Sequence, residues 1–165
     1  MRLAFSFLGD QMKSTEHHHK SPYIGLAVMG AVHLPIMYFV MFTMVWTSDE
    51  VVHNLNTFYM AGMMAAPMIL LMPLMMSSMY PNKKMNLLVY TSSVAIFLIL
   101  FWFMREQSFI GDRQFLRSMI PHHSGAILMC EKASLNDPEI KSLCDGIVKG
   151  QKSEIDQMKK ILDRL

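Results

Sequence analysis

The sequence predicts an all-α membrane protein, because three long apolar segments precede an amphipathic C-terminal segment that shows no strand pattern. Hydrophobic residues make up 52% of the 165 residues and charged residues only 17%, against about 25% charged residues in ordinary globular domains. Residues 23–46, 56–79 and 85–104 contain no Asp, Glu, Lys or Arg, and each is long enough to cross a bilayer as a helix. We therefore expect a three-helix transmembrane domain within residues 22–104.

The charges outside these spans predict the orientation. Basic residues lie before the first span and in the second connection, whereas the first connection, TSDEVVHNLN, has two acids and no Lys or Arg; the basic residues are Arg2, Lys13, Lys20, Lys83 and Lys84. The positive-inside rule then places a tail of residues 1–21 in the cytoplasm. Three crossings place residues 105–165 outside, which in a bacterial inner membrane means the periplasm or the exterior. Three arginines within residues 105–117 oppose this orientation weakly.

The C-terminal segment predicts two amphipathic helices joined by a short turn. The first is expected from near residue 105 to 133 and the second from 138 to 165, because Asp137 suits an N-cap and Pro138 the first helical position. Helices so joined form an antiparallel hairpin. At 100° per residue, the facing side chains are Phe115, Met119, His123, Ala126 and Cys130 on the first helix and Ile140, Cys144, Val148, Gln151, Ile155, Met158 and Leu162 on the second. This register sets Cys130 opposite Cys144 and His123 opposite Gln151.

The stretch SMIPHHSGAILMC, residues 118–130, gathers soft metal-ligand types on one helix. Neutral imidazole and thioether groups suit Cu(I) and Ag(I) rather than Mg²⁺ or Ca²⁺, and a proline inside a helix removes a backbone hydrogen bond and opens the helix locally. Methionine as a packing residue is the alternative. The spacing Met-x-x-His-His opposite Gln-x-x-Glu-x-x-x-Met favours a metal site, with candidate ligands Met119, His122, His123, Met129, Glu154 and Met158.

The segments FLRSMIPHHSGAILMCEKA and PEIKSLCDGIVKGQKSEIDQMKKIL resemble the family known as domain of unknown function 305, over about residues 109–165. Its members are extracytoplasmic, ferritin-like helical proteins rich in Met and His, and some are implicated in copper or silver binding. The resemblance implies that the hairpin is half of a ferritin-like four-helix bundle, which a second copy would complete. It also implies ligand roles for Met119, His122, His123, Met129 and Met158. The membrane spans and the two cysteines depart from the family pattern.

Cys130 and Cys144 are equally distant from the turn, so an antiparallel hairpin brings them opposite each other. A disulfide is favoured in an oxidising compartment, although its Cα atoms must approach to about 4.4–6.8 Å, closer than the 8–10 Å between most packed helices. Ligation of Cu(I) by the two thiolates is the alternative, and both cysteines are therefore also candidate ligands.

Methionines form stripes in two of the three spans. Five of them in the second span, Met64, Met68, Met72, Met75 and Met79, fall within about 80° on a helical projection, and Met29, His33, Met37, Met41 and Met44 cover about 120° in the first. The third span has no methionine between Met85 and Met104, so the enrichment is selective. Packing is slightly favoured over metal contact, for which His33, Met37, Met64 and Met68 are the candidates. A solvated tail without function is slightly favoured over metal binding for the histidine tract at residues 17–19, and His53 is expected in a solvated loop.

These observations predict a non-enzymatic, membrane-anchored protein that binds Cu(I) or Ag(I) outside the cytoplasm for sequestration, tolerance or hand-over. Its expected partners are membrane lipid, the metal ion, a second copy of the chain, and a copper transporter or chaperone. A net charge of +2 without a basic stripe argues against nucleic acid. The alternatives are a metal-transporter subunit that uses the methionine stripes and a structural helical module. A di-iron enzyme would need inward-facing Glu and Glu-x-x-His ligands, which neither C-terminal helix provides.

Overall fold

The structure is a computed structural model that describes residues 21–165, and the predicted tail with its histidine tract at 17–19 lies outside the described residues. Its elements, in chain order, are α2 (Pro22–Val40), the short 3₁₀ turns η2 (Met41–Met44) and η3 (Ser48–Glu50), α3 (Leu55–Met75), α4 (Lys83–Arg105), α5 (Asp112–Lys132) and α6 (Pro138–Arg164). Within residues 21–165 there is no strand. The predicted all-α class is therefore confirmed.

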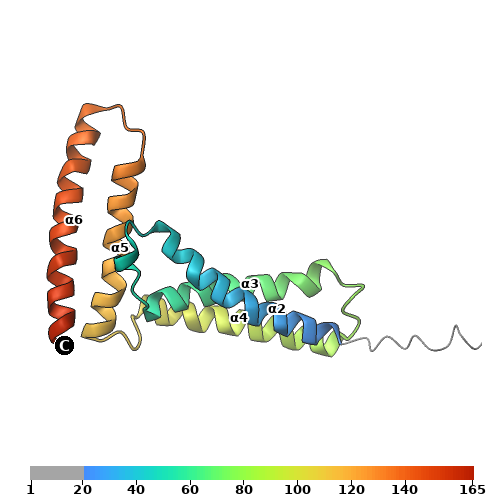
Figure 1. Cartoon of the computed structure of the whole chain (residues 1–165). Coiled ribbons are helices and arrows are strands. Elements are labelled where there is room, and N and C mark those ends of the chain that lie inside the picture. The colour runs from blue at the N-terminus through green and yellow to red at the C-terminus, as the bar shows by residue number, and fades with distance from the viewer. Residues whose placement is uncertain (1–20) are drawn as a thin grey trace, which may run out of the picture.

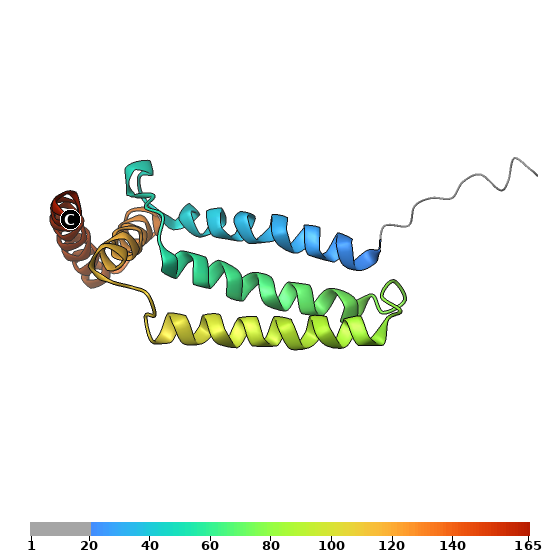
Figure 2. The same ribbon diagram turned by 90° about the horizontal axis from the view of Figure 1, so that it is seen from below.

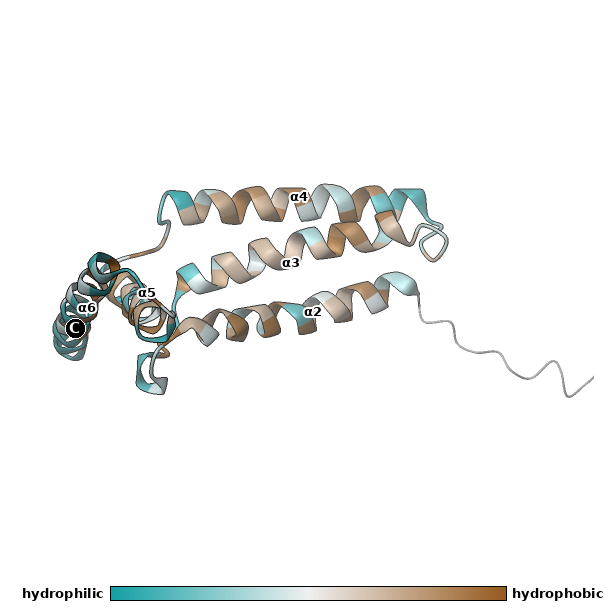
Figure 3. Cartoon of the chain, turned by 90° about the horizontal axis from the view of Figure 1, so that it is seen from above, coloured by the Kyte–Doolittle hydropathy of each residue, from teal (hydrophilic) through white to brown (hydrophobic). Residues whose placement is uncertain are grey.

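Three helical segments, Pro22–Met44, Leu55–Met75 and Lys83–Arg105, are long and apolar enough to cross a membrane. They lie side by side with α3 in the middle (Figure 2), and apolar residues run along most of their length (Figure 3). Small residues let α3 approach both neighbours. A Cβ at Gly30 would lie 2.8 Å from Cδ1 of Ile69, and one at Gly62 would overlap Leu100. Such close backbone approach is typical of helix contacts in membranes.

For their length and apolar composition we call these three segments the membrane helices. The hairpin of α5 and α6 lies across one end of them (Figure 1). We call this end of the membrane helices the hairpin end. It is formed by η2 at the end of α2, the beginning of α3 and the end of α4. α5 lies between α6 and the membrane helices, so it has a partner on each side (Figure 1). The apolar core between the two hairpin helices consists of Leu116, Ile120, Ile127, Ile155 and Met158.

A single helix beginning near residue 105 was predicted, and this is wrong at its start. α4 ends at Arg105, and α5 begins only at Asp112. Gln107 has a φ of 51°, and the N–H of Ser108 bonds back to the carbonyl of Phe103, which is the 6→1 bond of a Schellman motif. Glycine usually marks that left-handed position. Here Gln107 occupies it, so the sequence carried no visible stop signal.

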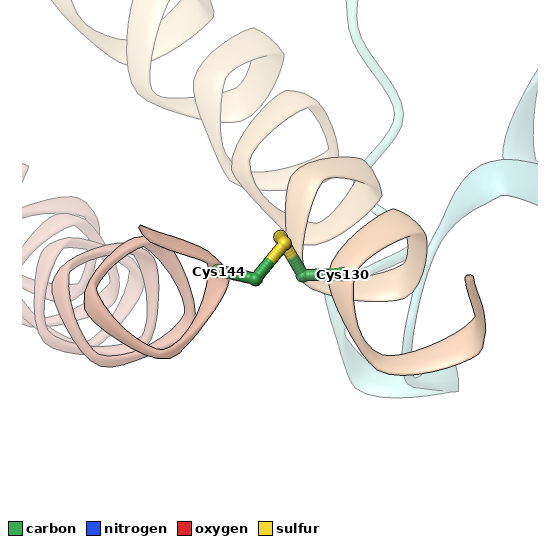
Figure 4. Close-up of a disulfide and its surroundings, with 2 residues drawn as sticks. All are labelled: Cys130 and Cys144. Carbon is green, nitrogen blue, oxygen red and sulfur yellow. A yellow bond between two sulfur atoms is a disulfide. The ribbon is translucent and has the colours of Figure 1, made fainter. Parts of the chain in front are cut away.

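The turn between the hairpin helices agrees with the prediction. Oδ1 of Asp137 accepts hydrogen bonds from the N–H groups of Glu139 and Ile140 at 2.8 and 3.1 Å, so it caps α6. Cys130 and Cys144 form a disulfide with a Cα–Cα distance of 5.4 Å (Figure 4). The predicted register at this level is confirmed. Phe115, however, was expected in the hairpin interface and is 51% exposed, because Leu116 and Ile120 fill that interface instead.

Candidate functional site

Ser124 holds α5 against the hairpin end. Its fully buried hydroxyl accepts a hydrogen bond of 2.7 Å from the backbone N–H of Trp46 and donates one to Oε2 of Glu50. Glu50 is also buried, and a carboxylate out of contact with water needs such a donor. Gly125, the next residue, lies close to η2, since a Cβ there would lie 3.4 Å from the carbonyl oxygen of Met44.

Further contacts join the hairpin to the start of α3 and to η3. Oε1 of Gln114 accepts a hydrogen bond from the N–H of Leu55 at 3.1 Å. On α6, Nζ of Lys159 pairs with Oδ2 of Asp49. The hydrogen bonds from Lys159 and Thr47 lower the pKa of the Asp49 carboxyl from 3.8 to about 2. Both helices of the hairpin are thus tied to the connection between α2 and α3.

A pocket of about 450 Å³ lies between the hairpin and the membrane helices. We call it the junction pocket. Six methionines and one histidine contribute to its wall, and they come from four segments: Met41 and Met44 of η2, Met60 of α3, Met104 of α4, and Met119, His122 and Met129 of α5. No Asp, Glu, Lys or Arg contributes to the lining, whose remaining polar residues are Asn54, Asn56, Thr57 and Ser118.

Three of the predicted ligands, Met119, His122 and Met129, line this pocket together with Pro121. α5 continues unbroken through Pro121. Of the other four methionines, Met41 and Met44 belong to the stripe that was weighed for metal contact, whereas Met60 and Met104 were not considered as ligands. Their signal was present in the sequence, because each lies close to the end of a predicted span, and three antiparallel helices bring those ends together.

The adjacent histidines belong to two different environments. His122 lines the junction pocket, whereas Nδ1 of His123 lies 2.9 Å from Oε2 of Glu154 on α6. That pair is not aligned as a hydrogen bond, and Nδ1 of His123 and Oε1 of Gln151 are both buried without a hydrogen-bond partner among residues 21–165. Met158 is buried in the hairpin core. The structure therefore divides the predicted ligand cluster into a membrane-facing group and an α6-facing group.

The prediction of Cys130 and Cys144 as candidate metal ligands is wrong. Both sulfur atoms are consumed by the disulfide, and a disulfide sulfur is not the thiolate that binds a metal ion. The favoured prediction, a disulfide between the two cysteines, is confirmed.

The candidate metal ligands within the spans do not line the junction pocket either; these are His33, Met37, Met64 and Met68. A separate cavity of about 450 Å³ lies between α2, α3 and α4, and the residues that line it include no methionine or histidine. The buried face of α3 carries Ala61, Gly62, Ala65 and Ala66. Met64 is 48% exposed and Met75 80% exposed, so these members of the α3 stripe face away from the neighbouring helices. His53, predicted in a solvated loop, is exposed and stacks on Tyr38, whose hydroxyl lies 3.0 Å from its Nδ1.

The donor types favour a soft monovalent ion. Among residues 21–165, no group of three or more His, Cys, Asp or Glu side chains could hold a metal ion, so the described chain lacks the usual all-protein arrangement for Zn²⁺ or a di-iron centre. Thioether groups with one imidazole suit Cu(I) and its heavier relatives.

Comparison with known proteins supports the domain assignment. Residues 103–162 match the family described as Domain of unknown function (DUF305). The chain is also 40% identical to "Uncharacterized protein L153" of Acanthamoeba polyphaga mimivirus over 113 residues, which are 67% of this chain and 72% of the viral protein. The chain belongs to the same family as this viral protein. The alignment covers 113 residues, which is more than residues 105–165 can supply. The similarity therefore extends into the membrane helices. No solved structure matches the chain.

Proposed function

We propose that this protein is a non-enzymatic, membrane-anchored binder of Cu(I), or of Ag(I), that sequesters the ion outside the cytoplasm or hands it to a partner. The observation that carries the proposal is the junction pocket, where Met119, His122 and Met129 of the DUF305 domain face a cavity whose lining has no charged residue. The neutral donors suit an ion of charge +1 better than a divalent ion, whose burial without a carboxylate would cost far more. Neutral ligands also permit release of the ion to a partner.

The charge distribution supports an extracytoplasmic site. Lys83 and Lys84 begin α4 at the end of the membrane helices opposite the hairpin, whereas Asp49 and Glu50 lie beside it. By the positive-inside rule, Lys83 and Lys84 favour a hairpin outside the cytoplasm, whereas Arg105, Arg113 and Arg117 on the hairpin side oppose this weakly. We extend the proposal to the inner membrane of a bacterium, with the hairpin in the periplasm and a copper transporter or chaperone as the recipient of the ion.

A second copy of the chain is part of the proposal. A two-helix hairpin has a small core for its length, and α6 exposes Ile140 and Leu143 beside the turn. Packing of two hairpins would cover these side chains and complete a four-helix bundle. A transporter role has less support, because the cavity between the described membrane helices is lined without methionine.

The adjacent histidines provide the test. Cu(I) affinity of the full chain in detergent should be measured by competition with a chromogenic Cu(I) chelator, for the wild type, His122→Ala and His123→Ala. We expect His122→Ala to weaken binding at least about tenfold, which is about 1.4 kcal/mol. His123→Ala should bind like the wild type, because its ring faces Glu154. Equal affinity of all three proteins, or the absence of copper from the wild type, would contradict the proposal.

A further inference from the structure

We infer that the soft-metal site is shared between the DUF305 hairpin and the membrane helices, with Met41, Met44, Met60 and Met104 as additional sulfur donors. The inference rests on the proposed function and adds to it which part of the chain holds the ion. The hairpin by itself contains only three of the seven soft donor residues that line the junction pocket. The membrane helices are then part of the binding site and not only its anchor.

The donor residues converge because of how α5 is placed. The residues of α5 that line the pocket, Ser118, Met119, Pro121, His122, Gly125, Ala126 and Met129, recur every three to four positions, so they form one face of the helix. The opposite side of α5 packs on α6 through Ile120 and Ile127. Because α5 lies across the hairpin end (Figure 1), that face lines the junction pocket together with residues of η2, α3 and α4.

The contact beside the pocket is specific. Ser124 ties α5 to the segment after η2 through its bonds to Trp46 and to Glu50 of η3, and Gly125 brings the backbone of α5 close to Met44 of η2. Small residues on the same face, Gly125 and Ala126, leave room in front of the methionine side chains. A Cβ at position 125 would lie in ordinary van der Waals contact with the carbonyl oxygen of Met44, at 3.4 Å, so the two backbones are close here.

The soft donor side chains line an open pocket of about 450 Å³. Met44, Met60 and Met129 are between 36% and 56% exposed, so an ion can reach this pocket from outside. Methionine is flexible, so several thioether groups can turn toward one ion. A cavity bordered by thioether groups and one imidazole is what a soft ion requires.

Binding in a shared site also links the ion to docking of the hairpin. An ion that binds only when both parts are in place stabilises the docked arrangement. Ag(I) should therefore slow hydrogen exchange in α5 and in the connection of residues 41–54 together, because the two surround the same ion.

The test compares three triple variants of the full chain in detergent, with Ag(I) and chelator-buffered Cu(I) as the probes. The membrane variant is Met44→Leu, Met60→Leu and Met104→Leu, and the hairpin variant is Met119→Leu, His122→Ala and Met129→Leu. The control is Met75→Leu, Met76→Leu and Met79→Leu, which removes three exposed methionines at the opposite end of α3. Methionine-to-leucine exchanges nearly conserve volume, and circular dichroism verifies that each protein stays helical.

We expect both the membrane and the hairpin variants to bind Cu(I) at least about tenfold more weakly than the control. X-ray absorption at the copper edge should show fewer sulfur neighbours in the membrane variant than in the wild type. If only the hairpin variant loses affinity, the shared site is refuted while the proposed function stands. If neither variant differs from the wild type, both fail. If the control weakens binding as much as the membrane variant, the ion binds along α3 and the junction pocket is not its site.

Discussion

Replacement of Ser124 by alanine tests whether the hairpin is held on the membrane helices by one buried contact. The hydroxyl of Ser124 is the donor to the buried Glu50 carboxylate and the acceptor for the N–H of Trp46. Ser124→Ala removes both bonds without adding bulk. It leaves a buried carboxylate and a backbone donor without these partners.

The expected cost follows from those two losses. A hydrogen bond to a charged group contributes about 1.5–3 kcal/mol, and a buried donor left without an acceptor costs about 1–3 kcal/mol. Allowing for partial relaxation, we expect a destabilisation of about 3 kcal/mol. In a chain of this size each kcal/mol lowers the melting temperature by about 2–4 °C, so the shift should be about 6–12 °C.

Thermal unfolding in detergent, followed by circular dichroism, provides the assay. Ser118→Ala is the matched control, because Ser118 is the same residue type on the same helix but bonds mainly to the carbonyl of Gln114 in α5 itself, at 2.8 Å. We expect it to cost less than about 1 kcal/mol. Glu50→Gln should reduce the effect of Ser124→Ala, since no charge is then left buried. Equal melting temperatures for Ser124→Ala and Ser118→Ala would refute the reasoning.

Two further predictions concern the hairpin and its attachment. Replacement of both Cys130 and Cys144 by serine should destabilise the hairpin by about 3 kcal/mol while leaving Cu(I) affinity unchanged, because neither residue lines the junction pocket and the variant has no thiolate at these positions that could bind the ion. Thiol titration of the denatured protein should find no free thiol among these two before reduction, and two free thiols there would contradict the bridge. The pKa of Asp49 is about 2 in the folded chain, below its unfolded value, so its contribution is present above about pH 4 and is lost as the pH falls toward 2. Asp49→Asn should remove this part of the acid destabilisation, which is at most about 1 kcal/mol for so exposed an ion pair. The control Asp156→Asn should not remove it. Identical acid unfolding curves for Asp49→Asn and the wild type would contradict the prediction.

Local signals in the sequence determined the secondary structure and the turn of the hairpin. Uninterrupted apolar runs can satisfy their backbone in a membrane only as helices or closed barrels, so the three spans could be located from composition. Asp137 and Pro138 act within the first turn of α6, and the disulfide partners followed from their equal distances to that turn. Each of these features depends on residues close together in the chain or on a simple antiparallel pairing.

Two further features were not predicted. The break after Arg105 depends on a left-handed residue that is Gln107 rather than glycine. The α3 stripe was considered for metal contact, yet the close-packed face of α3 belongs to Gly62 and the alanines around it. Small residues at helix contacts are the general pattern in membranes, because lipid offers methionine as good an apolar environment as another helix does.

Only the tertiary structure decided which side of α5 meets which partner. Helical periodicity shows that Met119, His122 and Met129 lie near one another, but it does not show what they face. His122 and His123 are neighbours in sequence and differ by about 100° around the helix, so one lines the junction pocket and the other lies beside Glu154. The pocket itself combines residues from 41 to 129. Its existence depends on the hairpin lying across the membrane helices, a placement set by the long-range contact of Ser124 with Trp46 and Glu50, which no local pattern in the sequence specifies.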